Sequence, residues 1–170
     1  MTKLITDLET IARVTQRNER KNLAFRSFIK GELDWSSRKL DALVHEILRS
    51  VTSEIDCTKC ANCCQVLGIE LHPADIKRLS RRLGISEQEL EGRHITPADD
   101  GEKVFGERPC FFLCDRMCTV YEDRPRDCRD YPHLHKKDFS TRLLSVLENA
   151  EICPIVFNVL EQLKECFNRR

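Results

Sequence analysis

Four cysteines lie within eight residues of this chain, at Cys57, Cys60, Cys63 and Cys64. A Cys-x-x-Cys step folds into a tight turn in which both thiolates can bind one metal ion. Here the step occurs twice in register, and another cysteine follows directly. Clustered thiolates are soft ligands that select zinc, copper(I) or iron–sulfur centres. The spacing therefore predicts a metal site.

Six further cysteines bring the total to ten: Cys110, Cys114, Cys118, Cys128, Cys153 and Cys166. A disulfide framework would suit a short secreted chain, but residues 1–30 carry many charges and no apolar signal segment. A buried free thiol suits Cys166, which lies among apolar residues of an expected helix. We favour metal binding for the cluster at 57–64, and not for Cys114 or Cys166 taken singly.

The composition indicates one soluble domain spanning residues 1–170. Lysine plus arginine and aspartate plus glutamate both number 28, so the net charge attracts neither nucleic acid nor acidic membranes. No apolar run approaches the length that spans a bilayer. We therefore expect a cytoplasmic protein without nucleic-acid or membrane partners, whose thiols stay reduced and available to metals.

Apolar periodicity predicts a mainly α-helical fold. An N-terminal helical pair covers residues 1–55, with Gly31 ending the first helix and Ser36 or Ser37 capping the second. The second helix has one apolar stripe, formed by Leu40, Leu43, Val44, Ile47, Leu48 and Val51. A C-terminal helix is expected at 154–170. The cysteine-rich region at 56–155 lies between them.

The expected centre is loop-rich. Pro73 suits the first turn of a helix that ends at Gly84, and Ser86 begins another helix. Residues 94–109 have the composition of turns, and residues 110–121 predict a small β-hairpin. The basic helix face at 77–82 could belong to a helix-turn-helix, but a solvated face agrees better with zero net charge.

With these elements placed, the chain resembles the YkgJ-like cysteine-cluster family, the CxxCxxCC zinc- or iron-chelating domain. The resemblance covers about residues 55–155. It rests on Cys57-x-x-Cys60-x-x-Cys63-Cys64, Cys110-x-Phe112-Leu113, Cys118-Thr119-Val120-Tyr121, Arg124-Pro125-x-x-Cys128-Arg129-x-x-Pro132 and Cys153. It implies eight metal ligands: Cys57, Cys60, Cys63, Cys64, Cys110, Cys118, Cys128 and Cys153. Cys114 and Cys166 fall outside the pattern.

Eight thiolates suggest two four-coordinate centres or one polynuclear centre. Adjacent side chains such as Cys63 and Cys64 diverge from the backbone, which favours two metals close together. Arg124, Arg129 and Lys59 are candidates to offset the thiolate charge from around the ligands; the less favoured alternative is that they are surface charges in turns. With eight cysteines present, His72, His133 and His135 are expected to be surface or supporting residues rather than ligands.

The leading hypothesis is a cytoplasmic protein that holds an iron–sulfur or other iron centre for electron transfer or metal handling. The alternative is a structural zinc module that acts through a protein partner. Thiolate spacing alone does not choose between iron and zinc. The family is often labelled an iron–sulfur oxidoreductase, but this sequence displays no catalytic triad, paired carboxylates or phosphate loop. Whether the protein is an enzyme is left open by these residues.

Overall fold

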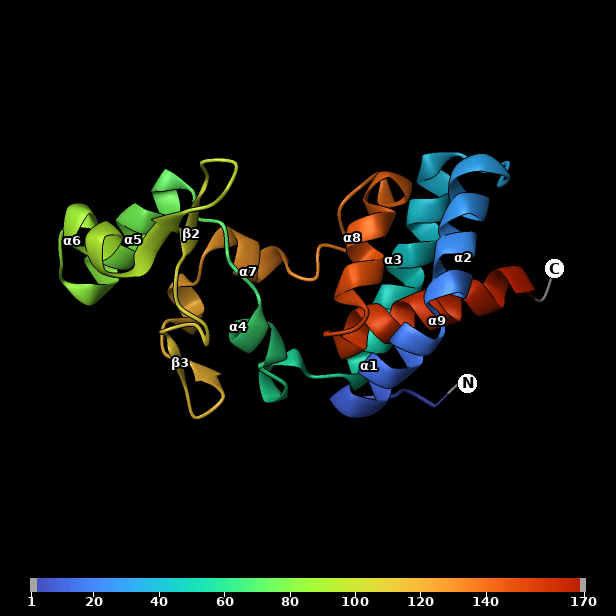
Figure 1. The fold of residues 1–170 in the computed structure, drawn as a ribbon, viewed down its shortest axis with the longest axis horizontal. Helices are drawn as coiled ribbons and strands as arrows, with labels where there is room; N and C mark the ends of the chain where they lie inside the picture. Colours follow the sequence, from blue (N-terminus) through green and yellow to red (C-terminus); the bar gives the residue numbers. More distant parts are fainter. Residues whose placement is uncertain (1–2, 169–170) are drawn as a thin grey trace. The chain divides into compact units, whose positions relative to one another are not determined.

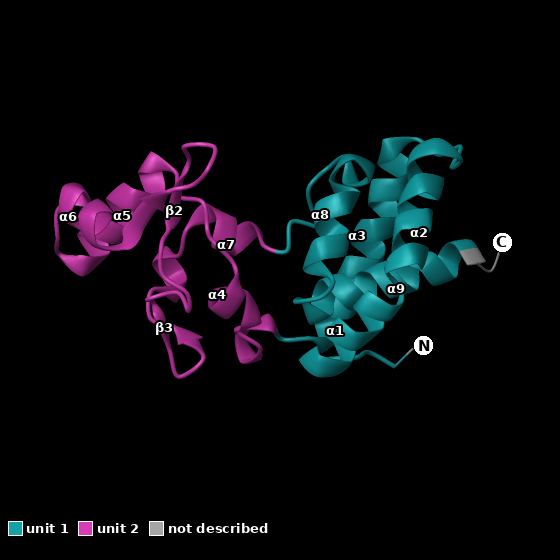
Figure 2. Ribbon diagram, viewed as in Figure 1, with its two compact units in different colours: residues 1–56, 132–170 teal, residues 57–131 magenta. Residues whose placement is uncertain are grey.

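A computed structural model describes residues 3–168, and the chain divides into two compact units (Figure 2). Unit 1 comprises residues 1–56 and 132–170, and unit 2 comprises residues 57–131. The expected single domain stays a prediction, because two compact units can belong to one domain. The extreme ends of the expected terminal helices, residues 1–2 and 169–170, lie outside the described residues.

Unit 1 is a bundle of helices (Figure 1). Its helices are α1 (Leu8–Arg17), α2 (Glu19–Gly31), α3 (Ser37–Glu54), α8 (Leu143–Asn149) and α9 (Pro154–Asn168), with a 3-10 turn at Phe139–Arg142. Helix α3 packs closely against α9, so the apolar stripe of α3 is buried by the C-terminal end of the chain. Leu40, Val44, Ile47 and Val51 all lie in this core.

The N-terminal segment contains two helices where one was expected, followed by α3. Asn18 interrupts the segment, because its backbone leaves the helical region (φ −96°, ψ 9°) between α1 and α2. The Asp7 carboxylate caps α1 by accepting a hydrogen bond from the Thr10 amide at 2.8 Å. Ser36 caps α3 as expected, by accepting a hydrogen bond from the Lys39 amide.

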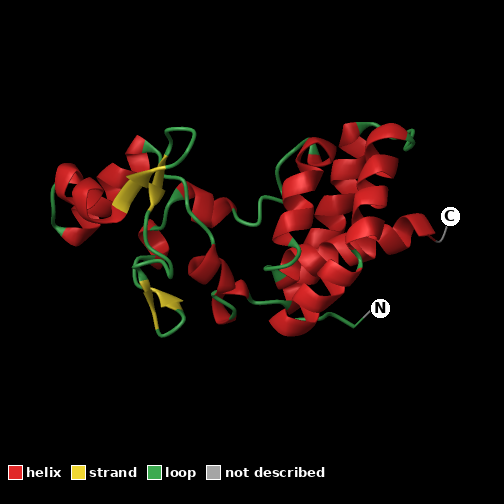
Figure 3. Ribbon diagram, viewed as in Figure 1, coloured by secondary structure: helices red, strands yellow, loops and turns green. Residues whose placement is uncertain are grey.

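Unit 2 is built from short elements (Figure 3). They are η1 (Cys57–Lys59), α4 (Asn62–Val66), α5 (Pro73–Leu83), α6 (Glu87–His94), β1 (Ile95–Pro97), β2 (Lys103–Phe105), β3 (Leu113–Cys114), β4 (Met117–Cys118), η2 (Tyr121–Asp123) and α7 (Arg126–Asp130). The strands form two antiparallel pairs, β1 with β2 and β3 with β4. Together with the bundle of unit 1, these elements confirm a mainly α-helical fold with a small β-hairpin.

Several boundaries in unit 2 agree with the sequence. Helix α5 begins at Pro73, and Gly84 caps its C-terminus with a φ of 70°, the left-handed conformation that glycine adopts easily. Ser86 caps α6, and β3 and β4 form the expected hairpin. The β1–β2 pair was expected to be loop. Its strands are three residues each, too short to show an alternating pattern beside Thr96-Pro97 and the turn at Gly101.

A hydrophobic cluster forms the core of unit 2. Its buried members are Ile69, Leu71, Ile76, Leu79, Leu90, Phe105, Phe112 and Val120. Cys110, Cys118 and Cys128 are half-buried and pack against this cluster. The core of unit 2 therefore positions three of the cysteines that the resemblance implies as ligands. Within the described residues, no helix combines the length and apolar character that a membrane span requires.

Candidate metal centre

The first cysteines lie in a turn followed by a short helix. The Cys60 amide donates a hydrogen bond to the Cys57 carbonyl at 3.1 Å, which closes the η1 turn. Ala61 then adopts a left-handed conformation, with φ 55°, and α4 begins at the next residue. Helix α4 carries Cys63 and Cys64, whose Sγ atoms are 4.0 Å apart. This spacing departs from the expected divergence of adjacent side chains.

A 4.0 Å separation is close to what one tetrahedral ion would impose. Four sulfurs at the usual Zn–S distance of about 2.3 Å lie about 3.8 Å from each other. The two thiols also interact electrostatically, because a hydrogen bond with Cys63 lowers the pKa of Cys64 to about 7. The lowered pKa favours the thiolate form of Cys64, which is the form that binds metals.

The β3–β4 hairpin is joined to the first cysteine turn. Asp115 and Arg116 have φ values of 48° and 65°, the signature of a two-residue type I′ turn. The Arg116 guanidinium at the hairpin tip donates hydrogen bonds to the carbonyl oxygens of Lys59, at 3.1 Å, and Cys60, at 3.5 Å. The role of Arg116 was not predicted from the sequence. The one available signal was its position after Asp115 in a turn, from which its side chain could reach and anchor the first cysteine turn.

Cys110 lies directly beside the α4 segment. Its amide donates a hydrogen bond to the Cys64 carbonyl at 2.8 Å. Its own carbonyl accepts from the Leu113 amide, also at 2.8 Å, so a tight turn leads from Cys110 into β3. Leu113 pairs with Cys118 across the hairpin. Backbone hydrogen bonding thus links the segments that carry Cys64, Cys110 and Cys118.

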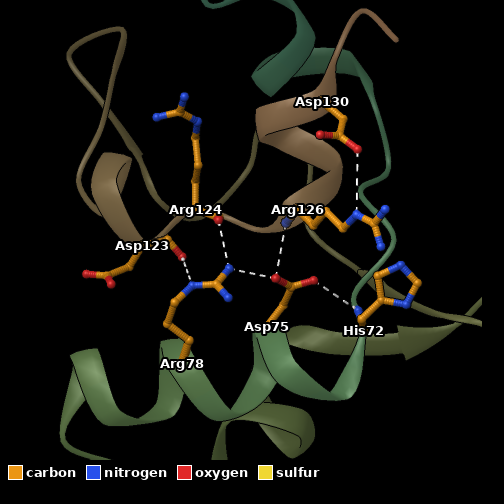
Figure 4. Close-up of polar contacts among 7 residues, drawn as sticks. All are labelled: His72, Asp75, Arg78, Asp123, Arg124, Arg126 and Asp130. Carbon is orange, nitrogen blue, oxygen red and sulfur yellow. Dashed lines mark hydrogen bonds and ion pairs between the residues drawn. The ribbon is translucent and has the colours of Figure 1, made fainter. Parts of the chain in front are cut away.

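A buried carboxylate fixes the segment that precedes Cys128 (Figure 4). Asp75, only 2% exposed, lies at the start of α5. It accepts hydrogen bonds from the His72 amide at 3.2 Å, the Arg126 amide at 3.1 Å and the Arg78 guanidinium at 2.6 Å. The Arg126 amide is at the first position of α7, so Asp75 holds the N-terminus of the helix that carries Cys128.

Arg78 extends the same network along the chain. Its guanidinium donates to the Asp123 carbonyl at 3.1 Å and to the Arg124 carbonyl at 2.9 Å, as Figure 4 shows. Together, Asp75 and Arg78 bind backbone groups of three residues on this segment, Asp123, Arg124 and Arg126. The connection between Cys118 and Cys128 is therefore held against α5. The sequence pattern indicated that Arg78 belongs to a solvated basic face, and it did not predict this hydrogen-bond network.

Four thiols from separate segments act on one another electrostatically. Burial, and then the thiolates of Cys110 and Cys64, raise the pKa of Cys128 to about 12. Burial, and then Cys64, likewise raise the pKa of Cys118, while the Arg124 guanidinium opposes this rise. Burial, Cys64 and Cys118 also raise the pKa of Cys110. A cation among these thiols would remove the mutual repulsion of their charged forms.

The donor chemistry fits a thiolate-bound metal, but the thiols are not yet in a ligand geometry. Within the described part of the chain, no group of three or more histidine, cysteine, aspartate or glutamate side chains is already arranged to hold a metal ion. Metal binding would therefore need the thiols to draw together. The surrounding elements are short, so such a movement involves turns and side-chain rotations rather than long helices.

The remaining expected ligands lie in different surroundings. Cys57 is exposed and Cys60 is half-buried, both at the η1 turn. Cys153 belongs to unit 1, where it is buried immediately before α9 and accepts a hydrogen bond from the Phe157 amide at 2.9 Å. The full set of eight ligands stays a prediction.

The residues expected around the ligands also differ in their contacts. Arg124 lies 3.7 Å from the centre of the Tyr121 ring and partly opposes the rise in the pKa of Cys118, as a charge-compensating residue would. Arg129 is exposed on α7, and the Lys59 carbonyl receives the hydrogen bond from Arg116. His133 is half-buried, whereas His72 and His135 are exposed.

The two cysteines outside the family pattern are set apart from the four interacting thiols. Cys114 is exposed beside the hairpin turn, where its Sγ lies 3.9 Å from the Asp115 carboxylate. Cys166 is half-buried in α9 of unit 1. These two positions provide matched controls for experiments on the expected ligands.

These observations describe a cysteine-rich domain, and comparison with known families identifies its class as metal-chelating. The chain belongs to the CxxCxxCC family, described as "Putative zinc- or iron-chelating domain", whose profile matches residues 56–154. The match begins one residue before Cys57 and ends one residue after Cys153, so it spans all eight expected ligands. No curated protein and no solved structure matches the chain significantly.

Proposed function

We propose that this protein binds iron in the cytoplasm through its clustered cysteine thiolates. The iron would be held as an iron–sulfur or other iron centre that serves electron transfer or metal handling. The observation that supports this proposal most strongly is the mutual electrostatic influence of Cys64, Cys110, Cys118 and Cys128. Three of these thiols also pack against the hydrophobic cluster of unit 2, and together the four supply the donors that a thiolate metal centre needs.

The charge balance is consistent with such a centre. Four thiolates around a divalent ion or a [4Fe–4S]²⁺ core leave a net charge of about −2. Arg124 already acts on Cys118, and Arg116 lies at the tip of the hairpin that carries this cysteine. Guanidinium groups in such places can offset the thiolate charge and tune metal affinity or reduction potential. Neither electron transfer nor metal handling requires a catalytic residue.

A structural zinc module is the second candidate, and the packing of η1 and α4 favours it. Neither of these short elements, which are described throughout, contains a buried residue. Short segments with little apolar burial depend on other interactions for their order, and a zinc ion supplies them in many small domains. In this case the metal would only stabilise unit 2, and a protein partner would carry the function.

Anaerobic purification followed by iron, sulfide and zinc analysis distinguishes the two candidates. The iron proposal predicts bound iron with thiolate-to-iron charge-transfer absorption, and with sulfide if a cluster is present. A stoichiometric zinc content without iron would instead support the structural module. Cys60→Ser, Cys64→Ser and Cys128→Ser should lose metal, whereas Cys114→Ser and Cys166→Ser should retain it. A wild-type protein without thiolate-bound metal would rule out both candidates.

A further inference from the structure

We infer that a basic groove on helix α5 is the docking surface for an acidic segment of a partner protein. The groove lies entirely within unit 2 and has a volume of about 580 Å³. Its walls are formed by Ala74, Lys77, Arg78, Arg81, Arg82 and Asp123. The inference goes beyond the proposed function, because it does not depend on which metal the thiols bind.

The four cations of this basic groove share one side of α5. Residues three and four positions apart are neighbours on a helix surface, so the cations form two rows, Lys77 with Arg81 and Arg78 with Arg82. The opposite side of the helix packs into the hydrophobic cluster of unit 2 through Ile76 and Leu79. The basic side of α5 is therefore fixed toward the surface.

The protein itself neutralises these cations only in part. Among the side chains of residues 3–168, no carboxylate pairs with Lys77 or Arg81, which are both exposed. Arg82 pairs with Asp123 at 3.4 Å, and its side chain remains 57% exposed. Like charges four residues apart repel each other on a helix surface. The basic groove thus carries a positive charge that carboxylates from outside the chain would stabilise.

The surroundings of the groove favour a short acidic protein segment over nucleic acid. Acidic residues outnumber basic ones in unit 2, and the neighbouring helix α6 carries Glu87, Glu89 and Glu91. A phosphate backbone that extends past the groove would meet this negative charge. A compact pair of carboxylates about 6 Å apart matches the one-turn separation of Lys77 and Arg81 instead.

Arg78 connects the basic groove to the chain segment that leads to Cys128 (Figure 4). Its side chain is 29% exposed, and its guanidinium binds the Asp75 carboxylate and the carbonyl groups of residues 123 and 124. A partner that covers Arg78 shields these hydrogen bonds from water. Occupation of the groove is therefore expected to order residues 123–126.

A synthetic peptide that carries glutamates at i and i+4 among alanines is the probe. The same peptide with glutamine in place of glutamate is its control. Binding to the full-length protein is measured by fluorescence anisotropy at an ionic strength of about 0.15 M, where only close charge contacts escape screening. The glutamate peptide should bind, and its affinity should decrease as salt is added. Equal binding of the two peptides, or no binding of either, would overturn the inference.

The double variant Lys77→Gln, Arg81→Gln tests the position of the peptide. Both substitutions remove cations that have no partner within the described chain, so the fold should be kept. The affinity for the glutamate peptide should fall about tenfold, the combined effect of two exposed ion pairs. Arg93→Gln is the control, because Arg93 on α6 is paired with Glu89 at 2.6 Å. An unchanged affinity in the double variant would reject the groove as the docking surface.

A second measurement uses only the wild-type protein. The glutamate peptide should shift the amide resonances of residues 77–82 and 121–126, and it should slow hydrogen exchange at the Arg126 amide. Shifts confined to other residues would contradict the inference. Inorganic phosphate and a single-stranded DNA oligonucleotide are titrated in parallel. If either one shifts the same resonances at a lower concentration than the peptide, the groove binds phosphate and the acidic protein segment is the wrong occupant.

Discussion

The guanidinium of Arg116 donates a hydrogen bond to the carbonyl oxygen of Lys59 across 3.1 Å. This bond connects two parts of unit 2 that are 57 residues apart, the tip of the β3–β4 hairpin and the first cysteine turn. The η1 turn contributes no buried residue, and this polar contact helps to set its position relative to the hairpin. The order of Cys57 and Cys60 is therefore linked to a residue outside the cysteine pattern.

Arg116→Ala should loosen the first cysteine turn without unfolding the protein. The loss of one such hydrogen bond costs about 1 kcal/mol, which corresponds to a severalfold increase in local opening. Hydrogen exchange should become faster at residues 57–61. Arg93→Ala is the control, because Arg93 forms only an exposed ion pair with Glu89. Equal exchange rates at this turn in both variants would contradict the anchoring role.

Asp75→Ala should destabilise unit 2 strongly. The substitution removes the acceptor of three hydrogen bonds and leaves the Arg78 guanidinium without its carboxylate. Removal of one partner of a buried ion pair typically costs about 3–5 kcal/mol, and the partial exposure of Arg78 places this case near about 3 kcal/mol. Urea unfolding of the metal-free protein measures the change. Lys77→Ala, at an exposed position of the same helix, should change stability little.

Metal removal should loosen unit 2 unevenly and leave unit 1 largely folded. Unit 1 has its own apolar core around α3 and α9, and α5 and α6 keep the hydrophobic cluster of unit 2. The η1 turn and α4 have no such support. Chelation should therefore speed hydrogen exchange most at residues 57–66. A similar increase throughout α3 would show that the bundle depends on the metal as well.

The stability of the metal-free, reduced protein should decrease as pH rises above about 9. The Cys128 pKa is raised from 9.0 to about 12, so between these values the folded state keeps a proton that the unfolded state has released. This stabilising contribution is complete below pH 9 and is lost as the pH approaches 12. Cys64 acts in the opposite sense, because its pKa is lowered to about 7 and its contribution is lost as the pH falls from 9 to 7.

Urea unfolding at a series of pH values, with chelator and reductant present, tests this dependence. Cys128→Ser should flatten the decrease above pH 9, because the serine hydroxyl does not titrate there. Cys114→Ser should preserve it, since Cys114 is exposed. A decrease of the same size in wild type and in Cys128→Ser would show that other groups cause it.

The sequence predicted the regular parts of the fold well. The stripe from Leu40 to Val51 identified α3, and Pro73 with Gly84 marked both ends of α5. These signals are local, because helix periodicity and end-capping act within a few residues. The break at Asn18 was not anticipated, since asparagine can lie within a helix as well as at its end.

The candidate site was predictable in its residue types and not in its arrangement. The cysteine spacing indicated metal binding, but the interaction of Cys64 with Cys110, Cys118 and Cys128 depends on backbone hydrogen bonds between distant segments. The roles of Asp75 and Arg116 were missed for the same reason. A carboxylate at the start of a helix and an arginine in a turn are common, and only the folded chain shows which carbonyl or amide groups they meet.

Unit 1 is discontinuous in the sequence, and this affects how the protein is made. Helix α3 leaves the ribosome early, but its packing partner α9 begins only at Pro154, after all of unit 2. Residues 57–131 are contiguous, so they can fold and take up a metal ion while the bundle is still incomplete. Metal supply during translation would then determine whether residues 57–131 hold a metal ion before α9 is synthesised.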